Sequence, residues 1–362
     1  MRLIWSPPSR GRQFSAFSES PWPARAAHPA ITTLRQKFAA LARRLLRRGA
    51  PPAPGRFSVS RKSSLHGFIS VAPAPPWREY LLYLPRNFEA VARPALVVWI
   101  HGCRQDPEAF AAGTRIARFA DARGFVVLLP RQSRMANSER CWNWFDRRTA
   151  AGAGEAAIVA AQATEAIDKF RIDRRRVYVA GLSSGGTLAA TLALREPRLF
   201  AAAAVHSSVA CGAATDAHDA ARAMVEGPRA ATDALAIEAR AKAGDKARVP
   251  ALIIHGAADG AVAPVNSVYL VRQFLLFNGL AQDELPAGAA LPPAQVRRFQ
   301  PRVSDYLAAD YYAGRRLAAR LVTVPGLAHA WSGGDPAFDF FDGARLEATA
   351  LICDFFAAHP RV

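Results

Sequence analysis

Short apolar runs alternate with helical patterns along most of this chain. The runs are rich in consecutive apolar residues, as strands covered on both faces are; they span 78–85, 95–100, 125–130, 177–180, 201–205, 251–254 and 320–324. Apolar spacing near 3.6 residues predicts helices between them, at 114–122, 155–170, 186–195, 267–278 and 345–358. We therefore expect one α/β domain over residues 58–362, with a mostly parallel sheet and helices on both faces. The proline-rich segment 282–303 lacks periodicity and is predicted to be a loop.

Residues 1–57 differ in composition and are expected to form a basic arm without a core of its own. Residues 1–62 hold thirteen Lys or Arg against a single acid, Glu19, and Pro and Ser are frequent in the arm. Within the arm, 34–48 places apolar side chains at helical spacing with Arg between them, which predicts an amphipathic helix. We expect this helix to dock on the domain or to form transiently. The alternative is weak contact with a membrane surface.

The net charge of +18 suggests a polyanionic partner until its distribution is considered. The 300 residues after position 62 hold 34 basic and 28 acidic groups, so we expect no nucleic-acid partner. No run of eighteen apolar residues occurs, which predicts no membrane span. Arg10, Arg12 and nearby prolines interrupt every apolar centre that a cleavable signal peptide would need.

One serine is predicted to be a nucleophile because it lies between a strand and a helix. The run 176–180 leads into the motif G-L-S-S-G, with Ser183 at its centre, and a helical pattern follows. A tight turn there presents the hydroxyl above the sheet, and the small Gly181 and Gly185 let strand and helix approach closely. Ser184 is the alternative hydroxyl, but its position in the motif makes its backbone N–H the useful group.

A serine hydroxyl needs a base, and in this arrangement the partners follow in the order Ser, acid, His. His329 lies in a loop after the last predicted strand, whereas His359 lies near the end of the chain. Asp259 directly follows the strand 251–254 and is the predicted acid that orients His329. His255 is expected to be structural. Other acids remain as alternatives, namely Asp216, Asp219 and Asp283.

A tetrahedral intermediate would need two N–H donors. Ser184 supplies one at the start of the predicted helix, and Cys103 supplies the other in the loop after the strand 95–100. Cys141 follows the strand 125–130, so both cysteines should lie at the carboxyl edge of the sheet. We predict a disulfide between Cys103 and Cys141, with two free thiols or a pairing with Cys211 as alternatives. The four cysteines contain no C-x-x-C pair, and no metal site is predicted.

Five motifs together resemble the polyhydroxybutyrate depolymerase family of esterases, relatives of feruloyl and acetylxylan esterases. They are HGCRQ at 101–105, CWNWF at 141–145, GLSSGG at 181–186, HGAADGAV at 255–262 and GLAHAWSGG at 326–334. The resemblance implies an α/β-hydrolase fold, a triad of Ser183, Asp259 and His329, and ester hydrolysis without a cofactor. It also suggests an extracellular or periplasmic location, while the missing signal peptide leaves the cytoplasm open.

The chain departs from the family pattern at Arg104, at Ser184 and in the loop 207–212, which we expect to border the substrate. Trp144 and Trp331 are predicted to line the substrate pocket. The expected substrate is a hydroxyalkanoate oligomer or another small ester. Feruloyl or acetyl sugar esters are the alternative, and a peptidase of the same fold would share the triad. The oligomeric state is left open.

Overall fold

The computed structural model describes residues 56–63, 77–229, 231–299 and 305–361. These residues belong to one compact unit, Ala53–Val362. The predicted amphipathic helix and its membrane contact lie outside the described residues. The first strand begins at Arg56, so the last two residues assigned to the basic arm belong to the sheet.

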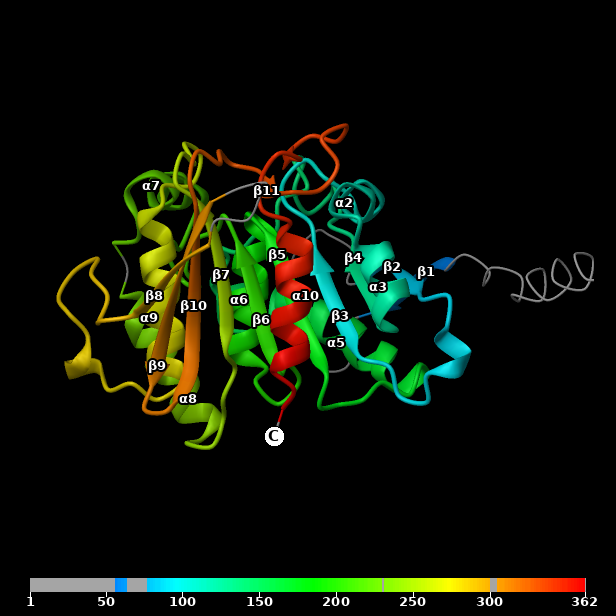
Figure 1. Ribbon diagram of the computed structural model, residues 1–362, viewed down its shortest axis with the longest axis horizontal. Coiled ribbons are helices and arrows are strands. Elements are labelled where there is room, and N and C mark those ends of the chain that lie inside the picture. Colours follow the sequence, from blue (N-terminus) through cyan, green and yellow to red (C-terminus); the bar gives the residue numbers. More distant parts are fainter. Residues whose placement is uncertain (1–55, 64–76, 230, 300–304, 362) are drawn as a thin grey trace, which may run out of the picture. The chain divides into compact units, whose positions relative to one another are not determined.

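Ten of the described strands form one sheet, and the central six are parallel. Figure 1 shows the sheet between its helices. The order is β1-β2-β4-β3-β5-β6-β7-β10-β9-β8, and antiparallel strands flank the centre on both sides. Their bounds are β1 Arg56–Ser63, β2 Trp77–Leu84, β3 Leu96–Ile100, β4 Val126–Pro130, β5 Val177–Leu182, β6 Ala202–His206, β7 Ala251–Gly256, β8 Gln295–Phe299, β9 Tyr306–Ala313 and β10 Arg316–Val324. A separate short pair joins β11 (Trp331–Ser332) and β12 (Phe341–Asp342).

Helices cover both faces of the sheet (Figure 1). They are α2 Pro107–Thr114, α3 Ile116–Arg123, α4 Arg147–Ala150, α5 Gly154–Lys169, α6 Ser184–Arg195, α7 Ala217–Glu226, α8 Thr232–Ala243, α9 Val265–Phe277 and α10 Ala348–Ala358, with short 3-10 turns at Phe88–Ala90 and Gln282–Glu284. No helix in the described ranges is long and apolar enough to cross a bilayer. The predicted α/β class is confirmed.

Two apolar cores separate the sheet from these helices. Because side chains alternate along a strand, Val98 and Ile100 of β3 pack with α5, α6 and α9, while Val97 and Trp99 pack with α2, α3 and α10. Every residue of β3 is buried. Because helices cover both faces of the central strands, these strands consist of continuous apolar runs, and the sequence predicted them for that reason.

The structure differs from the local predictions in three places. The helix expected at 114–122 is present as α3, but α2 before it was not predicted, and Arg115 in a left-handed conformation with φ 54° separates the two. The loop expected at 282–303 contains β8, whose five residues are all exposed and so carry no apolar alternation. The neighbouring β9 and the helices α7 and α8 were not predicted.

Candidate active site

Three loops at the carboxyl edge of the sheet bring Ser183, His329 and Asp259 together. Ser183 lies between β5 and α6, Asp259 follows β7, and His329 follows β10. His329 Nε2 lies 3.0 Å from Ser183 Oγ, and His329 Nδ1 lies 2.9 Å from Asp259 Oδ2. This is the geometry of a hydroxyl whose base is oriented by a carboxylate.

The turn that carries Ser183 is strained and tightly packed. Ser183 has φ 54° and ψ −123°, in the region that side chains rarely adopt. A Cβ on Gly185 would lie 2.3 Å from the carbonyl oxygen of His101, and one on Gly181 would lie 2.3 Å from that of Gly185. Ser208 Oγ donates a hydrogen bond of 2.6 Å to the Ser183 carbonyl. Glycine at two positions and a hydroxyl beneath the turn therefore hold the strained serine in place.

Asp259 is held as a buried carboxylate. It is 4% exposed, and its Oδ1 accepts N–H bonds from Ala261 at 3.1 Å and Val262 at 2.8 Å. Burial raises the pKa of Asp259, but the hydrogen bonds and charges of His329, together with the Val262 N–H, outweigh burial and lower it below its ordinary value. The carboxylate is therefore ionised and available to stabilise a protonated His329.

The alternative acids and base lie outside the triad. Asp216 caps α7 and accepts from the Asp219 N–H at 2.8 Å, and Asp219 pairs with Arg222. Asp283 is exposed in a 3-10 turn. His359 lies at the end of α10 with Nδ1 2.7 Å from the Phe355 carbonyl oxygen.

The two predicted oxyanion donors flank the nucleophile. No acceptor for the N–H of Cys103 or Ser184 is found among the described residues. Gly102 packs directly on the serine turn, because a Cβ added to it would lie 3.4 Å from Ser183 Cβ and 3.3 Å from the Leu182 carbonyl oxygen. Two unused N–H groups beside a serine hydroxyl could bind the oxyanion of a tetrahedral intermediate.

His101 orients the peptide that carries the Cys103 donor. It is fully buried, and burial lowers its pKa to about 4, so the ring is neutral. Nε2 accepts the Gln132 N–H at 3.2 Å, which places the proton on Nδ1, 2.7 Å from the Gly102 carbonyl oxygen. In a trans peptide the C=O and the next N–H point in opposite directions. By holding the Gly102 carbonyl, His101 therefore sets the direction of the Cys103 N–H.

The structure joins Cys103 and Cys141 by a disulfide, with Cα atoms 4.1 Å apart. Cys211 and Cys353 are free and buried. The disulfide ties the loop after β3 to the loop after β4. The described residues contain no cluster of three or more His, Cys, Asp or Glu side chains that could hold a metal ion.

Neither tryptophan is in a position to form an exposed substrate wall. Trp331 is fully buried, and its Nε1 donates to Thr349 Oγ1 at 3.1 Å, so its assignment to the pocket is corrected to the core. Trp144 is 5% exposed and belongs to a small apolar cluster with Val209 and Val262, next to the Asp259 loop. Burying the large apolar surface of an indole ring is favourable, which explains why both tryptophans pack in the interior.

The loop 207–212, which we expected to border the substrate, lies largely beneath the nucleophile. Ser207, Ser208 and Val209 are at most 2% exposed. Besides its bond to Ser183, Ser208 Oγ lies 2.7 Å from Thr187 Oγ1 on α6. The loop supports the serine turn from below.

Two further histidines support the triad. His206 stacks on Trp331 with ring centroids 4.9 Å apart, and its Nε2 accepts the Ser332 N–H at 3.1 Å, which fixes the strand after His329. Burial and the nearby His255 and His329 lower the pKa of His206 to about 3. His255 Nε2 lies 2.9 Å from the Val262 carbonyl oxygen, consistent with a structural role. The sequence analysis did not predict this supporting role of His206. Its position at the carboxyl end of β6, the same edge as the triad, could have indicated the role.

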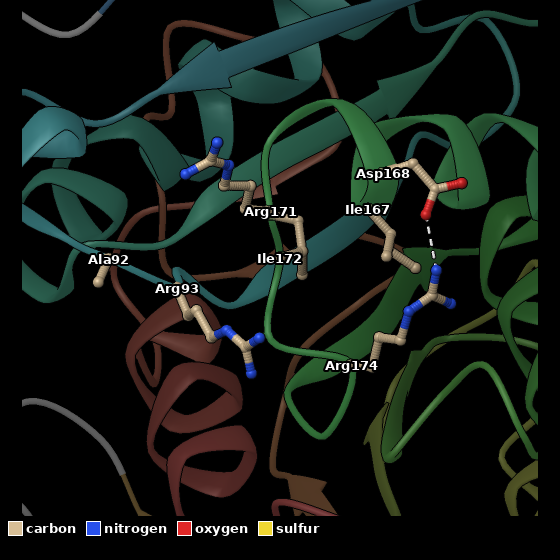
Figure 2. A pocket seen from close by; sticks show the side chains of 7 residues that line it. All are labelled: Ala92, Arg93, Ile167, Asp168, Arg171, Ile172 and Arg174. Carbon is tan, nitrogen blue, oxygen red and sulfur yellow. Dashed lines mark hydrogen bonds and ion pairs between the residues drawn. The ribbon is translucent and has the colours of Figure 1, made fainter.

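An open pocket lined by arginines lies near the amino end of β5, away from Ser183. Figure 2 shows the side chains that line it. Its lining residues come from the end of α5, the loop before β5 and the segment before β3; they are Ala92, Arg93, Ile167, Asp168, Arg171, Ile172 and Arg174. Arg174 Nη2 bonds to Asp168 Oδ1 at 2.6 Å. None of the triad residues lines this pocket, so it is separate from the candidate active site.

Comparison with known proteins gives the family and the fold of this chain. A family model described as esterase PHB depolymerase matches residues 78–291, more than half of the 362 residues. The chain belongs to this esterase family. A solved acetyl xylan esterase from Aspergillus awamori superposes with a TM-score of 0.63 at 21% identity, covering 83% of this chain and 99% of the other. The likeness shows a shared α/β-hydrolase fold, as predicted.

Curated relatives of this family member carry several esterase names. A probable acetylxylan esterase A of Neosartorya fischeri is 31% identical over 164 residues, 44% of this chain and 43% of its own. Feruloyl esterase B of Neurospora crassa is 34% identical over 130 residues, 35% of this chain and 43% of its own. Poly(3-hydroxyalkanoate) depolymerase C of Paucimonas lemoignei is 33% identical over 196 residues, 53% of this chain and 47% of its own. The matches span less than half of each relative's length.

Proposed function

We propose that this family member is a serine esterase that hydrolyses carboxylic esters through an acyl-enzyme. The single observation that carries the proposal is the chain of contacts from Ser183 Oγ through His329 to the buried Asp259, at 3.0 and 2.9 Å. A serine with its base and orienting carboxylate in reach is the arrangement that acyl transfer requires.

The reaction follows from the positions of these groups. Ser183 Oγ attacks the ester carbonyl carbon while His329 Nε2 takes its proton, and Asp259 stabilises the imidazolium. The N–H groups of Cys103 and Ser184 bind the oxyanion. When the intermediate collapses, the alkoxide leaves with the proton from His329. Water, deprotonated by His329, then attacks the acyl-enzyme and releases the acid.

The proposed substrate is a hydroxyalkanoate oligomer or another small ester. The name of the Paucimonas lemoignei relative, which shares the longest of the three matched segments described above, favours the hydroxyalkanoate. Feruloyl or acetyl sugar esters are the second candidate, favoured by the names of the other two relatives.

A panel of substrates tests both the reaction and the ester class. We would assay the purified full chain and its Ser183→Ala variant on p-nitrophenyl butyrate, hydroxybutyrate oligomers, methyl ferulate, acetylxylan and a peptide anilide. Turnover of an ester that disappears in the variant is expected, with hydroxybutyrate oligomers among the best substrates. Cleavage of the anilide alone, or ester turnover that survives in Ser183→Ala, would refute the esterase proposal.

A further inference from the structure

Glu155, at the start of α5, is a buried carboxylate outside the triad. It is 7% exposed and accepts three N–H bonds, from Gln132 Nε2 at 2.5 Å, from the Asn143 backbone at 2.7 Å and from Asn143 Nδ2 at 2.9 Å. Burial raises the pKa of Glu155 above its ordinary value, and these hydrogen bonds and the charge of Arg78 offset only part of the rise. Burying a carboxylate is costly unless it is well hydrogen-bonded, so its partners indicate what this costly group holds.

Both partners of Glu155 belong to the segment 131–146 that follows β4. Gln132 lies near the start of this segment and Asn143 near its end. The Gln132 side chain also donates to the Cys141 carbonyl oxygen at 2.9 Å. One carboxylate therefore ties the two ends of the segment to each other and to α5.

The same segment contacts the loop that carries the Cys103 donor at several points. The Gln132 backbone N–H donates to His101 Nε2 at 3.2 Å, and Trp142 Nε1 donates to the His101 carbonyl oxygen at 3.0 Å. Arg104 donates its backbone N–H to the Glu139 carbonyl oxygen at 2.6 Å. With the Cys103–Cys141 disulfide, these contacts hold the loop on both sides of the donor.

The segment also reaches the second donor. The Trp142 backbone N–H donates to Ser184 Oγ at 3.3 Å, and Ser184 Oγ lies 3.4 Å from Cys103 Sγ. Both residues whose N–H groups are free to bind an oxyanion thus contact the segment that Glu155 anchors.

We propose that Glu155 is a positioning residue for the oxyanion hole. It fixes the segment 131–146, and through that segment it fixes the peptide of Cys103 and the residue Ser184. This inference rests on the proposed esterase function. The disulfide by itself holds the segment 131–146 at one point, Cys141. The three N–H bonds to Glu155 hold the segment near both of its ends, at Gln132 and Asn143.

A loosened oxyanion hole should reduce turnover and leave substrate binding almost unchanged, because its hydrogen bonds strengthen in the transition state. Glu155→Gln keeps the shape of the side chain but replaces one acceptor oxygen with an NH₂ group, which would face an N–H of Gln132 or Asn143. Displacing catalytic groups by a fraction of an ångström to 1 Å lowers rates by about 10- to 100-fold. We expect kcat to fall by about that factor, with KM changed less than about twofold.

The experiment measures kcat and KM with p-nitrophenyl acetate as the substrate. Inhibition of the same reaction gives the affinity for phenylboronic acid, and a fluorophosphonate label counts the active sites. The boronate adduct of Ser183 should weaken in parallel with kcat, because it uses the same N–H donors. Asp168→Asn is the matched control, since Asp168 lies on the same helix but is exposed and pairs only with Arg174 among the described residues. It should behave as wild type.

A second variant covers the case in which Glu155→Gln does not fold. Gln132→Met removes the side-chain donor to Glu155 but keeps the backbone N–H that His101 accepts, and it should lower kcat in the same way by a smaller factor. Wild-type kcat in folded Glu155→Gln, or in Gln132→Met if the first variant is unfolded, would overturn the inference, as would a loss confined to KM. A wild-type chain that hydrolyses no ester would instead refute the proposed function.

Discussion

The two ends of the same parallel strands are built differently. At the carboxyl edge, the polar groups around Ser183 are buried and hydrogen-bonded, as His101, His206 and Glu155 show. At the amino edge, around the arginine-lined pocket, the charged groups are exposed. The pair of Asp168 and Arg174 there has side chains that are 62% and 66% exposed.

The difference shows where substitutions should matter. A buried polar group that loses its partner costs the full desolvation penalty, whereas an exposed ion pair contributes little because water screens it. Substitutions at the carboxyl edge should therefore be costly, and the amino edge should tolerate changes. The predictions below test this contrast.

The largest effect is expected at the nucleophile. Ser183→Ala should lower ester turnover by several orders of magnitude, because among the described residues no other hydroxyl lies within hydrogen-bond distance of His329 Nε2. Ser184→Ala keeps its backbone N–H and loses the contacts of its Oγ with the Trp142 N–H at 3.3 Å and with Cys103 Sγ at 3.4 Å, so most turnover should remain. Rates per active site on p-nitrophenyl butyrate would measure both. Equal losses in the two variants would contradict the assignment.

The next largest effect is expected at Gly185, which packs against the backbone at the end of β3. Gly185→Ala would place a Cβ 2.3 Å from the His101 carbonyl oxygen and 2.5 Å from that of Ile100, and backbone atoms cannot move aside cheaply. We expect a loss of about 1 to 3 kcal/mol in the free energy of unfolding and a large loss of turnover. Urea unfolding would measure the former. Gly260→Ala, where a Cβ would meet no atom within 4 Å, is the control.

Acidification should weaken the carboxyl edge through its buried histidines. The pKa values of His101 and His206 are lowered to about 4 and about 3, so each ring is neutral when folded and takes a proton on unfolding below about pH 6.5. The stability they contribute is present above pH 6.5 and is lost as pH falls toward pH 4 and 3, about 2 kcal/mol for each at pH 5.

Unfolding free energies at pH 7 and pH 5 would test this expectation. In a folded His206→Gln variant, the loss between the two pH values should shrink by about 2 kcal/mol. An unchanged pH dependence would show that His206 is protonated, or exposed, in the folded chain.

The smallest effect is expected at the amino edge. Arg174→Ala breaks the exposed pair with Asp168 and should change the free energy of unfolding by less than about 1 kcal/mol. Turnover of p-nitrophenyl butyrate should stay at the wild-type value. A severalfold loss of kcat would mean that the two edges are coupled and would undo the contrast.

Much of the architecture was predictable from local pattern. The central strands are buried on both faces, so β3 and β5 appear as continuous apolar runs. The spacing of glycines around Ser183 and the order of Ser183, Asp259 and His329 are properties of the chain itself. They predict the turn and the partners because every parallel strand ends at the same edge.

Tertiary structure decided the features that depend on neighbours distant in sequence. β8 is an exposed edge strand with no apolar pattern, and it exists because β9 lies beside it. Trp331 is apolar and near the triad, yet whether it faced a pocket or the core depended on Trp99 and His206 packing against it. Glu155 looks like any first-turn acid of a helix until the fold buries it. The spacing of apolar residues along the sequence indicates which face of a helix or strand is buried. A hydrogen-bond network depends on which elements lie next to each other in the fold, and that spacing does not indicate this.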